Sequence, residues 1–278
     1  RSRILPTTGM IRHRSRHAAM RHIHFALSSE AYTVVRLGQV TGKGYGVQIA
    51  TVSNQMYLAS PNGVRQSIMR VFSMENDPRS RNLLCDRSSI GAYLQDYGRR
   101  IAGALAGVNA DALERACALI ETTAANGNHI LSIGNGGSAA IADHLCCDLG
   151  KGTHHHNHPA INAQSLVANM PMYSAIANDF GFERVFEAQI DMIGRSGDVL
   201  IAISSSGNSP NILNAVEAAR ARGMTTIGLS GFDGGRLRES AEVSLHVDDH
   251  NYGIVEDAHQ AIMHVLAQYI ACKRDGVS

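Results

Sequence analysis

A histidine and a carboxylate stand one helical turn apart in the stretch "GNGGSAAIADHLCCDLGKG", residues 134–152. The stretch begins with glycines and continues with the spacing of a helix, on which His144 and Asp148 share one face. Imidazole and carboxylate groups side by side can transfer protons or hold a divalent metal. The question is whether the loop only binds an anion or belongs to a site that also moves protons.

Two loops have the composition of phosphate-binding turns. Residues 134–138 are Gly-Asn-Gly-Gly-Ser, and residues 204–209 are Ser-Ser-Ser-Gly-Asn-Ser. Glycine lets a backbone approach a ligand closely, and the unpaired N–H groups at a helix start attract anions. Either loop alone is explained equally well as a polar turn with a helix cap. Because both lie between a predicted strand and a predicted helix, the pair favours phosphate binding.

The last predicted helix, residues 254–273, carries a second polar set: Glu256, His259, Gln260 and His264. Glu256 and His264 lie within about 80° of each other around the helix axis. Each histidine alone has the ordinary surface or core position as its alternative. Together with His144 and Asp148, the set could hold Zn²⁺ or perform general acid–base catalysis.

Other candidate residues favour ordinary roles. The run "THHHNHP", residues 153–159, precedes a proline and is interpreted as a solvated loop. Lys151 could pair with substrate charge or lie free on the surface. The five cysteines include no CxxC pair, which predicts reduced thiols in a cytoplasmic protein.

The order of predicted elements indicates an α/β fold. Amphipathic helices are expected over 89–108 and 109–127, with Asn109 or Asp111 at the N-cap of the second. Strands and helices then alternate, which predicts a three-layer, doubly wound sandwich around a mostly parallel sheet. Ligands of such sheets bind at the C-terminal ends of the strands. The expected strands are 129–134, 161–166, 198–206, 225–231 and 242–247, and the expected helices between them are 137–149, 170–179, 182–194, 211–223 and 234–241.

Charge divides the chain of 278 residues, whose net charge is only +1, into two parts. Residues 1–73 are rich in arginine and histidine and contain a single acid, Glu30. This extension has three interpretations: a transit peptide, a nucleic-acid-binding arm, or sequence upstream of a natural start at Met74. We expect it to be disordered. No apolar run approaches the ~20 residues of a membrane helix, so no membrane partner is expected.

Five segments together resemble the sugar isomerase (SIS) domain, specifically the phosphoheptose isomerases. They are "GNGGSAAIADHLCCD", "AIANDFGFERVFEAQI", "GDVLIAISSSGNSPNI", "RGMTTIGLSGFDGG" and "EDAHQAIMHVL", in the order and spacing of the family. The resemblance covers residues 89–273 and implies a flavodoxin-like SIS domain. It also implies a homotetramer with sites at subunit interfaces, in which helices of residues 89–126 form the oligomerisation segment.

The resemblance implies a role for each matching residue. Asp148 and His264 would be catalytic. The Zn²⁺ set, one ion per subunit, would be His144, Asp148, Glu256 and His264. Asp179 would reach the sugar of a neighbouring subunit's site. The remaining substrate-binding positions would be Asn135, Gly136, Gly137, Ser138, Ser204, Ser205, Ser206, Ser209 and Glu256.

Two positions depart from the family pattern. Asp148 stands where the family has Glu, and Glu256 stands where better-studied members have Gln. A shorter catalytic arm displaces the carboxylate, and an error of about 1 Å can cost on the order of 100-fold in rate. The added charge of Glu256 favours a bound cation over an empty site. We therefore expect a stronger dependence on metal.

The resemblance implies an aldose–ketose isomerase that converts sedoheptulose 7-phosphate to D-glycero-D-manno-heptose 7-phosphate, a lipopolysaccharide precursor. The expected partners are this sugar phosphate and further copies of the chain, without nucleic acid. One alternative is a non-catalytic SIS protein that binds a DNA-replication initiator. Another is a sugar-phosphate-sensing module. A pure binder has no need of Asp148 and His264 beside one phosphate pocket, so that pair favours the enzyme.

Overall fold

The computed structural model describes residues 88–276 and, before them, the backbone of five short strands. The chain divides into two units, Arg1–Phe72 and Ser73–Ser278. In the first unit β2 (Ala31–Val40) pairs antiparallel with β1 (Ala26–Ser28) and β3 (Gly44–Thr51), while β4 (Tyr57–Ala59) pairs with β5 (Arg65–Ser67). The rest of the basic extension lies outside the described residues, and its expected disorder stays a prediction.

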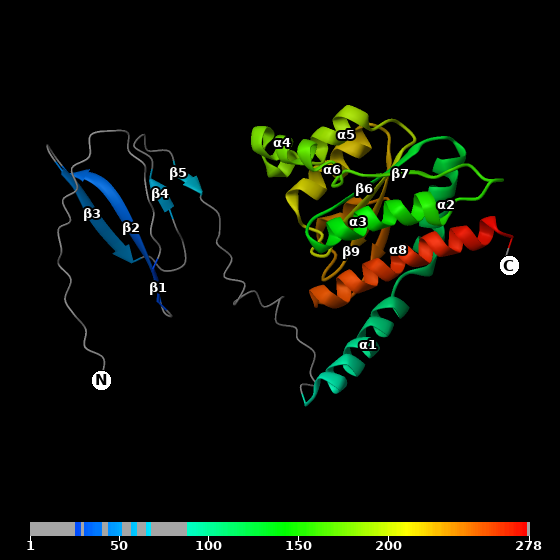
Figure 1. Cartoon of the computed structure of the whole chain (residues 1–278), viewed down its shortest axis with the longest axis horizontal. Coiled ribbons are helices and arrows are strands. Elements are labelled where there is room, and N and C mark those ends of the chain that lie inside the picture. The colour runs from blue at the N-terminus through cyan, green and yellow to red at the C-terminus, as the bar shows by residue number, and fades with distance from the viewer. Residues whose placement is uncertain are drawn as a thin grey trace. The chain divides into compact units, whose positions relative to one another are not determined.

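The second unit is built around a parallel sheet of five strands (Figure 1). The strands are β6 (His129–Gly134), β7 (Asn162–Ser165), β8 (Val199–Ser204), β9 (Thr225–Ser230) and β10 (Val243–His246). Their spatial order is β10-β9-β8-β6-β7, with every pair parallel. This is the flavodoxin-like order, which confirms the predicted doubly wound fold. The order reverses at β6, so the crevice for ligands opens beyond the ends of β6 and β8.

Helices cover both faces of the sheet because strand residues alternate between two apolar clusters. On β8, Val199, Ile201 and Ile203 pack into one cluster, while Leu200 and Ala202 pack into the other. The first cluster includes residues of α2 (Ala110–Ala125), α3 (Gly137–Cys147) and α8 (Tyr252–Arg274). The second includes residues of α4 (Met170–Phe180), α5 (Glu187–Ile193), α6 (Pro210–Ala221) and α7 (Gly235–Ser240).

The structure corrects some predicted boundaries. The expected helix 182–194 is a 3-10 turn, η3 (Phe182–Arg184), followed by the shorter α5. The closing helix α8 begins two residues earlier than expected, at Tyr252, because Asn251 caps it by accepting from Ile254 N at 3.1 Å. Asn109 is the N-cap of α2, as predicted, and accepts from Ala112 N at 2.8 Å.

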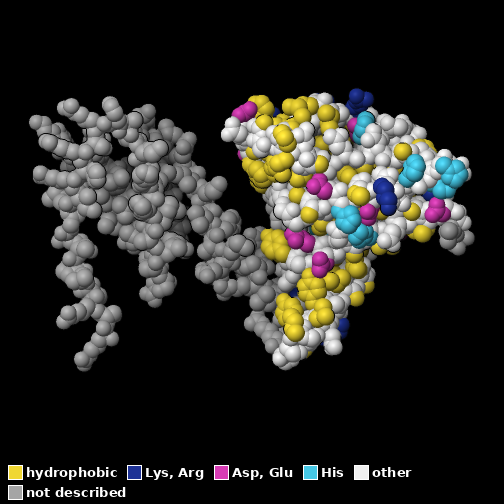
Figure 2. Space-filling model, viewed as in Figure 1, with side chains coloured by type: hydrophobic (Ala, Val, Ile, Leu, Met, Phe, Trp, Pro, Cys, Tyr) yellow, Lys and Arg dark blue, Asp and Glu magenta, His cyan; other side chains and the backbone are white. Residues whose placement is uncertain are grey.

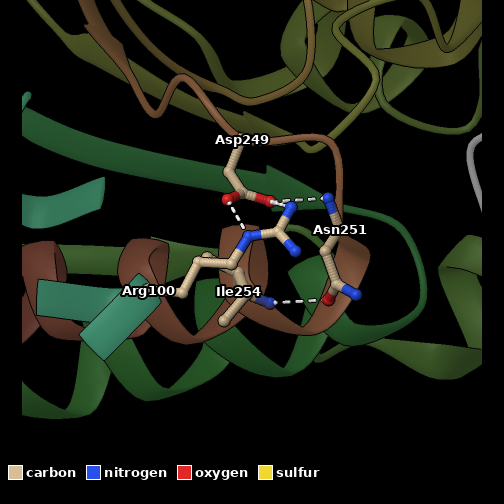
Figure 3. A network of polar contacts seen from close by, with 4 residues as sticks. All are labelled: Arg100, Asp249, Asn251 and Ile254. Atoms are coloured by element: carbon tan, nitrogen blue, oxygen red, sulfur yellow. Dashed lines mark hydrogen bonds and ion pairs between the residues drawn. The ribbon is translucent and has the colours of Figure 1, made fainter. Parts of the chain in front are cut away.

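Helix α1 (Ile90–Ala106) projects from the body beside the start of α8 (Figure 1). An ion pair holds it there: Arg100 Nε and Nη2 donate to the two Asp249 carboxylate oxygens at 2.6 and 2.9 Å (Figure 3). Asp249 also accepts from Asn251 N at 2.7 Å, which ties the pair to the cap of α8. Nearby, Tyr97 donates to Asp257 at 2.6 Å. The position of α1 is therefore coupled to the start of the helix that carries His264.

Candidate active site

The glycine loop begins where β6 ends, at the crevice of the sheet. A Cβ at Gly134 would collide with the carbonyl of Ser138, so only glycine allows the chain to turn this tightly. Gly136 has a φ of 56°, and α3 starts at the next residue. Gly136 and Gly137 are exposed, whereas Ser138 is buried. The loop thus leaves Gly136 and Gly137 exposed at the start of α3, and its predicted part in phosphate binding stays a prediction.

The serine loop follows β8 on the other side of the crevice. Gly207 has a φ of 63°, and a Cβ there would collide with the carbonyl of Gly234, so this turn also requires glycine. Ser204 Oγ lies 3.5 Å from Ser209 Oγ, and Ser206 Oγ accepts a hydrogen bond from the backbone N–H of Asn208 at 3.3 Å. The Ser205 hydroxyl is buried and has no hydrogen-bond partner among the described residues.

Two asparagines join these loops. Asn135 of the glycine loop and Asn211 in the first turn of α6 exchange two hydrogen bonds, each 2.9 Å. Asn211 is only 1% exposed, so this pairing is part of the folded interior. Asn211 was not predicted as a site residue from the sequence. Its position two residues after Ser209 is the one signal that could have indicated this role. The pairing places the two candidate phosphate loops side by side.

The histidine and carboxylate groups also meet. His264 Nδ1 lies 2.9 Å from Asp148 Oδ2, although the two residues are 116 positions apart. His144 Nε2 lies 3.5 Å from Asp148 Oδ1, and the two imidazole rings make an edge contact at 4.9 Å. The cluster is partly open to solvent, with side-chain exposures of 47% for His144, 26% for Asp148 and 37% for His264. Figure 2 shows histidine and acidic side chains gathered on one face of the described surface.

Gln260 completes this cluster. Its Nε2 lies 3.0 Å from both His144 Nδ1 and His264 Nε2. The sequence placed Gln260 in the polar set of the last helix, but assigned it no role. One helical turn before His264, it is on the same face of α8.

Asp148 stands at a change of helix type. The α-helix α3 ends at Cys147, and a π-helix, η2 (Asp148–Gly152), continues it. The Thr153 amide donates to the Asp148 carbonyl, five residues earlier, at 3.1 Å. Such π turns are rare in proteins, and those that occur are often found at functional sites. The sequence predicted an ordinary helix to residue 149, so the wider turn was not anticipated.

Glu256 lies apart from the ligand cluster. A Cβ built on Gly137 would lie 2.5 Å from Glu256 Oε2, so the carboxylate rests against the first turn of α3. Burial, followed by the nearby charge of Asp257, raises the pKa of the Glu256 carboxyl. Contacts among the described residues do not test its predicted part in the metal set, which stays a prediction.

The remaining candidates lie elsewhere. Asp179 is exposed on α4, which Figure 1 shows well separated from α8, so its predicted role would concern another subunit's site. Lys151 is exposed in η2. His259 is fully buried, and burial lowers its pKa to about 4. The four described cysteines are free thiols, and burial raises the pKa of Cys146 to about 11.

Arg274 links the two ends of the histidine-rich loop, residues 153–159. Buried Arg274 donates to the carbonyls of Thr153 and Pro159, each at 3.1 Å. Between these anchors His155 stacks on His156 with ring centroids 4.5 Å apart. Three of the four histidines in the loop are exposed, in agreement with the expected solvated loop.

The donor set fits a zinc ion. Within the described part of the chain, His144, Asp148 and His264 form the one group whose ligand atoms lie within 4.8 Å of one another. Two imidazoles and one carboxylate match the three-ligand sets of catalytic zinc sites, which leave a position open for substrate.

No helix of the described residues combines the length and apolar character needed to cross a membrane.

Comparisons with known proteins agree with this architecture. Residues 92–231 match the model of the SIS domain family. Phosphoheptose isomerases of Yersinia pestis and Serratia proteamaculans are each 40% identical over 163 residues, covering 58% of this chain and 83% of theirs.

Two solved structures are similar to the second unit. The phosphoheptose isomerase of Neisseria gonorrhoeae has 32% identity and a TM-score of 0.60, over 65% of this chain and 96% of that one. The enzyme of Francisella tularensis has 29% identity and a TM-score of 0.60, over 66% and 96%. The chain belongs to the SIS domain family and, within it, to the phosphoheptose isomerases.

Proposed function

We propose that the chain is an aldose–ketose isomerase that converts sedoheptulose 7-phosphate to D-glycero-D-manno-heptose 7-phosphate. The observation that carries the proposal is the 2.9 Å contact between His264 Nδ1 and Asp148 Oδ2, in a chain whose two phosphate-type loops are joined by Asn135 and Asn211. The relatives are named phosphoheptose isomerases, and this supports a heptose phosphate as the substrate. The product is a precursor of heptose in surface polysaccharide.

The reaction moves a proton between C1 and C2 of the sugar. A base removes the C1 proton of the ketose to give an enediol or enediolate, and a proton is returned at C2. Protons also exchange on O1 and O2 during this transfer. Asp148 and His264 serve as the acid–base pair because their side chains already share a hydrogen bond. The two residues carry out the proton transfers in either order.

The phosphate end of the substrate is bound by the two loops. Ser204, Ser206 and Ser209 supply hydroxyls, and the open start of α3 after Gly136 supplies backbone N–H groups. Binding energy from this end positions C1 and C2 against the acid–base pair. Asn135 holds the glycine loop in place through Asn211.

His144, Asp148 and His264 are the residues that would hold Zn²⁺. When bound, the ion supplies positive charge for the oxygens of the enediolate. Glu256 of α8, whose carboxylate rests against the start of α3, is proposed to contact the sugar or to join this set when the ion is present.

The acid–base cluster favours an enzyme over the two non-catalytic alternatives. A protein that only binds or senses a sugar phosphate needs the loops, but gains nothing from a carboxylate and two histidines in contact with one another. The test is to mix the purified full chain, loaded with zinc, with sedoheptulose 7-phosphate and to follow aldose formation by NMR. Appearance of the heptose product supports the proposal, while absence of conversion by folded, zinc-loaded protein refutes it.

The enzyme is further proposed to be a homotetramer with sites at subunit interfaces. No residue of the 17-residue α1 is buried, and its Ile90 and Leu94 are 85% and 69% exposed. On α8, Val265 and Tyr269 are also exposed, at 53% and 47%, and Figure 2 shows apolar side chains along the projecting helix. A second copy would cover these apolar groups and exclude water from the half-open cluster. Light scattering should give four times the chain mass, and replacing Ile90 and Leu94 with Asp should reduce it.

A further inference from the structure

Three consecutive backbone carbonyls of the serine loop accept hydrogen bonds. Two of them, Ser205 O and Gly207 O, accept from backbone N–H groups of residues 231–237, each at 2.9 Å. The carbonyl between them, Ser206 O, accepts from the side-chain amide of Asn208 at 3.0 Å. A carbonyl oxygen repels an anion, and one that is held in a hydrogen bond does not turn toward it. These bonds therefore bear on how the loop meets a phosphate.

Asn208 connects the serine loop to the start of α7. Its Nδ2 donates to Ser206 O, and its Oδ1 accepts from Arg236 N at 3.1 Å. A carbonyl needs a donor and an N–H group needs an acceptor, so an amide in this one orientation satisfies both neighbours. The cap residue of α7 is Gly234, which has no side chain to accept from the first turn. Asn208 therefore takes the place of a capping side chain for α7.

Gly235, the first residue of α7, lets the helix approach the serine loop. Its φ is 55°, and a Cβ there would lie 2.5 Å from Ser206 O and 2.6 Å from Asn208 Nδ2. Gly127, just after α2, has a φ of 71°, but nothing lies within 4 Å of the place of its Cβ. Alanine is therefore strained at both positions, but displaces the serine loop only from Gly235.

We propose that Asn208 is a positioning residue, which fixes the serine loop in the conformation that binds phosphate. It holds Ser206 O and caps α7, so the loop and α7 keep one relative position. The hydroxyls of Ser204 and Ser209 are then already arranged when the phosphate arrives, which reduces the cost of binding. The inference rests on the proposed isomerase function for its effect on KM, whereas phosphate binding is measured without turnover.

Two substitutions disturb this arrangement, one from each side. Asn208→Ala removes both side-chain hydrogen bonds, and Gly235→Ala pushes against the serine loop. Each has a matched control. Asn214→Ala removes one hydrogen bond of 3.1 Å, which an asparagine of α6 donates to a carbonyl of η3. Gly127→Ala adds the same kind of backbone strain in open space.

The first readout is the dissociation constant of inorganic phosphate. It is measured by ³¹P NMR titration of the full chain after chelation, so that phosphate does not bind a metal. Asn208→Ala and Gly235→Ala should raise this constant by about tenfold, because a loop that leaves its binding conformation binds more weakly. Asn214→Ala and Gly127→Ala should bind phosphate as wild type does. Urea denaturation of each variant establishes that folded proteins are compared.

The second readout is kinetic. KM for the sugar phosphate should rise by about tenfold in Asn208→Ala and Gly235→Ala, while kcat falls by less, because the acid–base pair is untouched. A purely structural role would lower the urea midpoint without changing phosphate affinity, and that result would overturn the inference. Wild type that binds no phosphate would overturn it as well. If wild type binds phosphate but shows no isomerase activity, the proposed function fails, and the titration alone decides the role of Asn208.

Discussion

Asn135 and Asn211 exchange two hydrogen bonds of 2.9 Å across the point where the strand order of the sheet reverses. Each amide donates to and accepts from the other, so neither loop can shift without breaking both bonds. Asn135 belongs to the glycine loop and Asn211 to the helix after the serine loop. This pair sets the distance between the two proposed phosphate contacts.

Replacing Asn211 with Ala should weaken both folding and substrate binding. The change leaves the Asn135 amide without its partner, at a cost of about 1–3 kcal/mol in the free energy of unfolding, measured in urea. KM for the sugar phosphate should rise more than kcat falls, because the loops, not the acid–base pair, are disturbed. Asn135→Ala should add little to Asn211→Ala, and fully additive effects would contradict a shared interaction.

Asp148→Asn should abolish most turnover while leaving the fold intact. The substitution keeps the shape of the side chain but removes its charge and basicity, so the partner of His264 can no longer accept or return a proton. We expect kcat to fall by about 10²–10⁴-fold with little change in KM. A kcat near that of wild type in the Asp148→Asn variant would exclude Asp148 from proton transfer.

Removing metal should reduce activity. His144, Asp148 and His264 offer one ligand atom each within 4.8 Å, and the carboxylate is one methylene shorter than the family's Glu, which we expect to increase reliance on the ion. Chelation should lower kcat by roughly tenfold or more, and Zn²⁺ should restore it. Metal content is measured by mass spectrometry on the same samples. Undiminished turnover by metal-free protein would rule out this dependence.

Arg100→Ala should destabilise the protein, because Asp249 is only 9% exposed and would lose both hydrogen bonds to the guanidinium. We expect a loss of about 2–3 kcal/mol in the free energy of unfolding, measured by urea denaturation.

The neighbouring pair provides a matched control. Arg99 bonds to Asp96 at 2.9 Å but is 68% exposed, so Arg99→Ala should cost less than about 1 kcal/mol. A double substitution of Arg100 and Asp249 should be less damaging than the sum of the two single changes. Equal effects of Arg99→Ala and Arg100→Ala would show that the ion pair does not anchor α1.

His259 should make stability depend on pH. Its pKa is lowered by burial to about 4, whereas the unfolded chain has the ordinary value near 6.5. Below pH 6.5 the unfolded state therefore takes up a proton that the folded state does not, and stability falls until about pH 4. At pH 5 the loss is about 2 kcal/mol. Urea denaturation of wild type and His259→Leu from pH 8 to 5 should show a smaller decline in the variant, and parallel declines would contradict this assignment.

The sequence by itself determined the type and order of the elements and the two loops. Apolar residues such as Val199 and Leu200 alternate along β8 and fill opposite clusters, which is why the three-layer arrangement was predictable. Gly136 and Gly207 marked the turns because positive φ values favour glycine. These are local properties, written in neighbouring residues.

Only the tertiary structure decided which faces meet. Periodicity places His264 and Gln260 on one face of α8, but says nothing of which helix lies opposite, so the contacts with His144 and Asp148 depended on how α8 packs beside α3. The π turn at Asp148, the Asn135–Asn211 pair and the place of Glu256 against Gly137 depend on the same packing. Helix packing joins residues more than 100 positions apart, and no pattern within a single segment contains that information.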